Sequence, residues 1–301
     1  MRYLIVVTII WAFSFSLIGV YLSGHVDAWF SVLMRIGIAT LIFLPFLRLK
    51  EIKTETIFRL TAIGAVQLGF MYCFYFQSFR FLTVPEVLLF SVFTPIYITL
   101  LNDILSKRFH KGHLFTALLA VLGAAYIQYS SISENVFLGF LIMQGANLCF
   151  AVGQVSYKYL LKSRPELKST PKHTIFGLFF IGAFIVALIA FFIFGSTEKM
   201  PTTSVQWGII LYLGAVASGA GYFLWNQGAA KVNIGSLAIM NNVLVPIGLI
   251  VNLVIWNKEA DIRKILIGGS LIFTSLALNE YLNKRNQGLA KFSLFKPRKS
   301  D

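Results

Sequence analysis

The chain has 301 residues, of which 57% are hydrophobic and 13% charged, whereas a soluble domain carries about 25% charged residues. With a mean hydropathy of +0.76, this composition excludes a soluble globular protein, a disordered chain and a secreted disulfide scaffold. Cys73 and Cys149 fall inside apolar segments and lack metal-ligand spacing, so we interpret them as packing residues. The composition therefore predicts an all-α membrane protein.

Apolar segments of about 20 residues, the length that crosses a bilayer as a helix, occur ten times. The first is too long for a removable signal and lacks a small-residue cleavage site. The loops leave no room for a separate soluble domain. The predicted spans are 3–22, 28–47, 58–79, 85–105, 113–130, 136–157, 174–195, 206–225, 234–256 and 263–282.

Basic residues concentrate on alternate loops. Lys and Arg outnumber Asp and Glu by 26 to 12, for a net charge of +14. Twenty of them lie at the N-terminal end, around the loops that follow the even-numbered spans, and in the tail, against five on the other side. The positive-inside rule therefore predicts that both termini are cytoplasmic. Residues 284–301 are predicted to form a basic cytoplasmic tail, which is a topology anchor or a contact for anionic lipid rather than for nucleic acid.

The sequence carries a weak internal duplication, with halves at residues 1–133 and 134–283. A single offset of 151 aligns Pro95 with Pro246 and relates the segments around them. Because each half has an odd number of spans, the second half enters the membrane from the opposite side. This predicts two inverted five-helix repeats, the arrangement of many secondary transporters, with substrate held near the midplane. The two prolines remove a backbone N–H at matching points, so they are candidate hinges or inert kinks.

Polar and aromatic side chains recur at helical spacing inside five of the spans. In the sixth span, Gln144, Asn147, Gln154 and Lys158 share one helix face. Any single amide can form a structural hydrogen bond between helices that contributes only about 0.6 kcal/mol. Five such faces together favour a central pocket. The candidate substrate-binding residues are Trp11, Ser14, Gln67, Tyr72, Asn147, Gln154, Tyr157, Lys158, Tyr222, Trp225, Asn226, Asn241 and Asn242.

Two cations in or near the membrane have alternative interpretations. Arg35 lies inside the second span, about 10 Å deep at 1.5 Å per residue. It is either a structural or snorkelling arginine, for which Glu86 is a possible partner, or a contact for an anion on the entry path. Lys158 is either a cytoplasmic topology lysine or the partner of a substrate carboxylate, which needs a compensating charge in a low dielectric.

Motifs of several other protein classes are absent from the sequence. All four histidines lie in loops or at span ends, and there is no phosphate-binding loop, nucleophile elbow or cluster of metal ligands. A potassium-channel filter motif is also missing. We therefore expect neither an ATPase nor another enzyme, and neither a metal nor a cofactor.

The chain resembles the EamA-type permeases of the drug/metabolite transporter superfamily. The resemblance reaches to about residue 283, and its most discriminating parts are Gly-His-Val-Asp and Ile-Met-Asn-Asn. The segments that carry it are 11–16, 21–27, 43–48, 67–72, 94–100, 219–226 and 235–242.

Within that superfamily the resemblance is to the carboxylate/amino acid/amine branch, and it implies uptake of biotin. The implied protein is a multi-pass secondary transporter of the bacterial cytoplasmic (inner) membrane that works by alternating access. One alternative is export of amino acids or other amphipathic metabolites. Another is an intramembrane enzyme, which no catalytic pair supports. Biotin would suit the predicted pocket, because amides pair with a ureido ring, aromatic faces cover a thiophane, and a cation meets a carboxylate.

Overall fold

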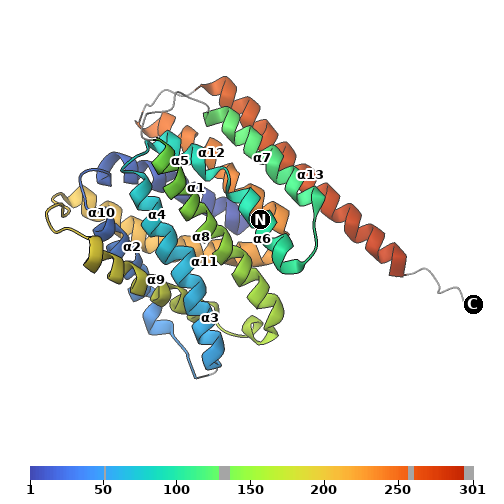
Figure 1. Cartoon of the computed structure of the whole chain (residues 1–301), viewed down its shortest axis with the longest axis horizontal. Coiled ribbons are helices and arrows are strands. Elements are labelled where there is room, and N and C mark those ends of the chain that lie inside the picture. Colours follow the sequence, from blue (N-terminus) through green and yellow to red (C-terminus); the bar gives the residue numbers. More distant parts are fainter. Residues whose placement is uncertain (51, 129–135, 257–260, 295–301) are drawn as a thin grey trace, which may run out of the picture.

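The chain folds into a bundle of helices (Figure 1), seen in a computed structural model that describes residues 1–50, 52–128, 136–256 and 261–294. Nine helices in these ranges are long and apolar enough to cross a membrane, and Lys111–Ile127 is a shorter apolar helix. Each of the ten predicted spans corresponds to one of them, which confirms the predicted all-α multi-span architecture. Of the predicted tail, residues 295–301 lie outside the described part of the chain.

The first half contributes five spans, four of which are divided. A π-helix continues the first, a 3₁₀ turn ends the second, a π-helix interrupts the third, and the fourth consists of two helices. Their helices are α1 (Arg2–Leu17), η1 (Ile18–Leu22), α2 (Ala28–Phe43), η2 (Leu44–Phe46), α3 (Thr54–Gly64), η3 (Ala65–Phe70), α4 (Met71–Ser78), α5 (Val84–Ser91), α6 (Thr94–Ser106) and α7 (Lys111–Gln128).

The second half repeats this order with fewer interruptions. Its third span again contains a π-helix, η5, which lies between two α-helices. The helices are α8 (Val136–Ser163), η4 (Pro165–Lys168), α9 (Lys172–Phe194), α10 (Ser204–Tyr212), η5 (Leu213–Ala220), α11 (Gly221–Lys231), α12 (Ile234–Trp256) and α13 (Ile262–Leu294).

Local sequence signals set several helix ends. The Asp27 carboxylate accepts the backbone N–H of Phe30 at 2.8 Å and caps α2. A capping box of Thr83 and Glu86 starts α5, so the carboxylate that was considered for Arg35 bonds the N–H and hydroxyl of Thr83 instead. Hydropathy alone misplaces other ends: α8 runs to residue 163 rather than 157, and α13 continues to residue 294, because a polar helix can extend beyond its apolar segment.

The helix contacts obey a two-fold exchange of the two halves. α1 packs against α12, and correspondingly α8 packs against α5 and α6; α2 packs on η5, and α9 packs on η3. α2 pairs with its counterpart α9, and α7 pairs with α13 along one edge of the bundle, where Figure 1 shows them side by side. Since five spans separate the counterparts, this pattern is the one expected of two inverted repeats.

The fourth span is broken rather than kinked at its proline. α5 ends at Ser91 and α6 restarts at Thr94, with Pro95 in its first turn. The break leaves carbonyls that side chains of other helices satisfy: Asn147 donates to Phe90 O at 2.7 Å, and Asn242 donates to Val92 O at 3.2 Å. Pro246, by contrast, lies inside the continuous helix α12.

Candidate functional site

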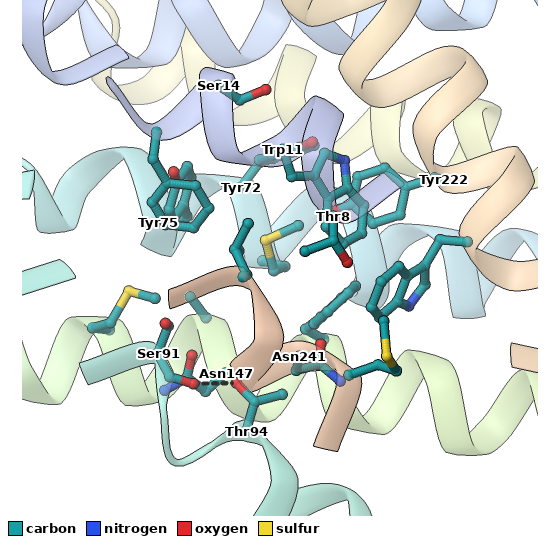
Figure 2. A pocket seen from close by; sticks show the side chains of 18 of the residues that line it. Thr8, Trp11, Ser14, Tyr72, Tyr75, Ser91, Thr94, Asn147, Tyr222 and Asn241 are labelled. Atoms are coloured by element: carbon teal, nitrogen blue, oxygen red, sulfur yellow. Dashed lines mark hydrogen bonds between the residues drawn. The ribbon is translucent and has the colours of Figure 1, made fainter. Parts of the chain in front are cut away.

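A cavity lies where the two halves meet (Figure 2). Small-molecule sites occur preferentially at such interfaces and between the helices of bundles. Its walls come from α1, α2, α4, the α5–α6 break, α8, α11 and α12. We call this cavity the central pocket, and it is lined by Thr8, Trp11, Ser14, Phe15, Arg35, Met71, Tyr72, Tyr75, Ser91, Thr94, Met143, Ala146, Asn147, Phe150, Tyr222, Trp225, Met240, Asn241 and Leu244.

Matching helices of the two halves supply matching positions of the lining. At an offset of 150, Tyr72 corresponds to Tyr222 and Tyr75 to Trp225. The two residues of the first half follow the π-helix η3, and their two counterparts follow the π-helix η5. Such π segments inside α-helices are frequent at functional sites. Arg35 breaks the symmetry, because it comes from α2 while the lining contains no described residue of the counterpart α9.

Aromatic rings form one wall of the central pocket. The Trp11 ring lies 4.9 Å from Tyr222 and 4.7 Å from Trp225, centroid to centroid, and Phe150 meets it edge-on at 5.9 Å. The Trp11 indole N–H donates to the carbonyl of Ala217 at 2.8 Å, which ties α1 to η5. This wall offers an apolar surface of mutually tilted rings, which are held by one another and by the backbone.

Arg35 places a buried positive charge at the central pocket. Its side chain is only 3% exposed, its Nε donates to Ser218 Oγ at 2.5 Å, and its guanidinium carbon lies 4.2 Å from the centre of the Tyr72 ring. Its Nη1 atom is buried without a hydrogen-bond partner in the described part of the chain. Because an unpaired buried charge is costly, the site is suited to an anion that would accept from the free side of the guanidinium.

The polar residues of the opposite wall are largely engaged with backbone. Thr94 donates to the carbonyl of Ser91 at 2.8 Å, the bond drawn in Figure 2. Asn241 donates to Leu237 O at 2.9 Å within its own helix, and Asn147 donates to Phe90 O at the helix break. In the described part of the chain, the recorded bonds of these two asparagines use their side-chain nitrogens as donors.

Eight of the residues selected from the sequence line the central pocket. They come from six helices, and they include Arg35, for which the sequence analysis considered a contact with an anion. These residues are Trp11, Ser14, Arg35, Tyr72, Asn147, Tyr222, Trp225 and Asn241.

The other six selected residues lie outside the lining. Gln67 donates to the side chain of Asn226 at 3.2 Å, and Asn242 bonds the α5–α6 break. Gln154 is fully buried one helical turn beyond Phe150. The last two, Tyr157 and Lys158, lie further along α8.

Tyr157 and Lys158 have structural partners. The Tyr157 ring packs edge-on against Phe176 and Phe179 at 5.8 and 5.3 Å. The Lys158 ammonium donates to the backbone carbonyls of Ala229, at 2.8 Å, and of Val232. These carbonyls belong to the C-terminal end of α11, where a cation is favoured.

Sequence reasoning did not select the remaining lining residues. Most lie one turn from a selected residue on the same helix, as Thr8 does from Trp11, so the helical period was the signal that could have found them. Met71 lies one turn from the selected Gln67, and Tyr75 lies one turn from the selected Tyr72. Among the described residues, no group of three or more His, Cys, Asp or Glu could hold a metal ion.

Comparison with known proteins gives consistent matches over almost the whole chain. The model of the EamA-like transporter family matches residues 1–129 and again 137–281. A biotin transporter of Escherichia coli (strain K12) is 50% identical over 277 residues, which cover 92% of this chain and 91% of that protein. A biotin transporter of Salmonella typhimurium is 48% identical over the same shares. A probable biotin transporter of Pseudomonas aeruginosa is 46% identical, covering 93% of this chain and 97% of its own.

A solved crystal structure shares the fold. It superposes with a TM-score of 0.74 at 15% sequence identity, over 93% of this chain and 97% of the solved one. At that identity the likeness concerns the fold alone.

Proposed function

The chain belongs to the EamA-like transporter family, and from this premise we propose that it carries biotin across the membrane and holds it in the central pocket. The resemblance seen in the sequence is thereby confirmed, and the chain is a transporter rather than an enzyme. The observation that carries the substrate assignment is the 46–50% identity to biotin transporters over at least 92% of the chain.

The chemistry of the central pocket supports this substrate. Biotin has a carboxylate on a flexible valerate chain, an apolar thiophane ring and a polar ureido ring. Arg35 supplies the buried cation for the carboxylate, and the wall of Trp11, Tyr222 and Trp225 supplies the surface for the thiophane ring. We assign the carboxylate to Arg35 rather than to Lys158, whose ammonium bonds two backbone carbonyls outside the pocket.

We further propose that residues 1–133 and 134–283 are the two repeats that move against one another during alternating access. The central pocket is lined by helices of both halves, so relative motion would open it first to one side and then to the other. The proposed hinges are the α5–α6 break at Pro95 and the part of α12 around Pro246. Each proline lies within two residues of a lining residue, Thr94 or Leu244.

Growth on external biotin tests the proposed function. In a bacterial strain that neither makes nor imports biotin, expression of this chain is expected to restore growth at low biotin concentrations. The control is the same vector carrying Arg35→Ala, which should require far more biotin. Equal growth with wild type and empty vector, despite wild-type protein in the membrane, would refute the proposal.

The proposed location is the bacterial cytoplasmic membrane with both termini inside. A fluorescent reporter that matures only in the cytoplasm should be bright when fused after residue 290 and dark when inserted at Gly24, between the first two spans. The result follows from the 20-to-5 asymmetry of basic residues. A dark C-terminal fusion with a bright insertion at Gly24 would reverse the orientation.

A further inference from the structure

Three buried amides each lie one helical turn beyond the lining of the central pocket. Gln67, Gln154 and Asn226 are each fully buried. Each lies four residues along its helix run from a pocket-lining residue: Met71, Phe150 and Tyr222, respectively. In the proposed topology all three steps lead toward the cytoplasm, because α8 and α11 run inward there while η3 and α4 run outward. We call Gln67, Gln154 and Asn226 the amide layer.

The amide layer has far more hydrogen-bonding capacity than it uses. One bond is made within it, from Gln67 Nε2 to Asn226 Oδ1 at 3.2 Å. In the described part of the chain, no partner is found for Gln67 Oε1, Asn226 Nδ2 or either polar atom of Gln154. The neighbouring Trp225 Nε1, on the pocket wall, is also unpaired.

These unpaired atoms indicate that the amide layer can hydrogen-bond to a ligand. A buried polar group without a partner costs about 1–3 kcal/mol, and apolar side chains of similar size would avoid that cost. Interhelical glue, the simplest role for membrane amides, requires bonds that Gln154 does not make. The unpaired atoms are therefore better explained by a ligand that they meet in another step of the transport cycle.

The unpaired atoms include both the acceptors and the donors that a cyclic urea needs. Two acceptors, Gln154 Oε1 and Gln67 Oε1, suit the two urea N–H groups. Three donors, Gln154 Nε2, Asn226 Nδ2 and Trp225 Nε1, suit the two lone pairs of the urea carbonyl. An ion would use only one half of this set. A cation would pair with the two acceptor oxygens but not with the N–H donors, and an anion would pair with the donors but not with the oxygens.

Resting on the proposed function, we propose that the amide layer is a second subsite that binds the ureido ring of biotin, while Arg35 holds the carboxylate. Ser218, the partner of Arg35, and Asn226 are eight residues apart along η5 and α11, which is about 12 Å of helix. An extended valerate chain with its bicyclic head bridges a span of this size. Biotin thus lies with its head toward the cytoplasmic end of the bundle.

Tight helix packing leaves no room for a ligand ring in the amide layer of this structure. Helix α8 presses against η3 so tightly that a Cβ on Gly153 would lie 2.1 Å from the Cβ of Gln67. One turn further, Lys158 ties α8 to the end of α11 through two carbonyls. The ureido ring therefore enters fully only when η3 and α8 separate, which is the motion that opens the inner side.

The test compares two ligands on the purified full-length protein. One is biotin, and the other is the thiophane valerate acid that lacks the ureido ring. By titration calorimetry, Gln154→Met is expected to weaken biotin binding about tenfold and to leave binding of the ureido-free acid unchanged, as one lost partnership of about 1.4 kcal/mol predicts. Its melting temperature without ligand should equal or exceed that of wild type, because an unpaired buried amide has been replaced by an apolar chain.

The matched control is Gln227→Met, which alters a half-buried glutamine adjacent to the layer residue Asn226 and should change neither ligand's affinity. Asn226→Leu repeats the test from a second helix if Gln154→Met does not fold. A folded variant that keeps the wild-type ratio of the two affinities would overturn the subsite. Failure of wild type to bind biotin at all would instead overturn the proposed function.

Discussion

Arg35→Gln is expected to lower the affinity for biotin by roughly 10- to 150-fold and to abolish the preference for biotin over its neutral amide. The guanidinium is 3% exposed, its Nη1 atom is unpaired, and no ion pair of Arg35 occurs among the described residues, so a substrate carboxylate would supply the missing charged partner. A hydrogen bond to a charged group contributes about 1.5–3 kcal/mol, and each 1.4 kcal/mol is about tenfold. Competition of each compound against labelled biotin measures the two affinities.

Two further variants make this result specific. Arg35→Lys keeps the charge but loses the planar fork and the stacking on Tyr72, so it should be intermediate. Lys158→Gln should keep the preference for the acid, because Lys158 bonds backbone carbonyls, although it can lower the amount of folded protein. Loss of the preference in Lys158→Gln with retention in Arg35→Gln would return the carboxylate to Lys158.

Trp11→Ala should weaken biotin binding by about 30-fold or more. Trp11 contacts both Tyr222 and Trp225, and truncation of a central aromatic side chain in a binding site typically costs about 2 kcal/mol or more. The same change removes the bond to Ala217 O that ties α1 to η5.

Binding of labelled biotin by purified protein measures this effect. Trp11→Phe should lie between wild type and Trp11→Ala, since it retains a ring but not the indole N–H. Trp207→Ala is the control, because Trp207 is 45% exposed and does not belong to the lining. If Trp11→Ala folds and binds biotin as wild type does, the aromatic wall is not part of the binding site.

Hydropathy and charge were sufficient to predict the architecture, and the reason is physical. A bilayer requires about 20 apolar residues per span, so the ten spans are visible without any knowledge of packing. The break in the fourth span was only partly visible. Pro95 marked a disturbance, but the helix separates there because Asn147 and Asn242, from α8 and α12, supply donors to its free carbonyls. Those partners lie far away in the sequence.

The helical period identified the helix faces that point into the bundle, but not which turn of each helix lines the central pocket. Asn147 and Gln154 belong to one stripe of α8, yet the first lines the central pocket and the second lies in the amide layer. A stripe repeats at every turn, so spacing alone does not say which turn opens onto a cavity. The same holds for Arg35 and Lys158, which differ in what surrounds them rather than in sequence pattern.

Counterflow in proteoliposomes tests the central claim, transport of biotin by this chain, most directly. Vesicles that contain purified protein are loaded with unlabelled biotin, diluted into a trace of labelled biotin and filtered over time. We expect transient accumulation of label that biotin amide inside the vesicles does not support and that Arg35→Gln abolishes. Vesicles with folded wild-type protein that bind biotin but accumulate no more label than protein-free vesicles would contradict the account.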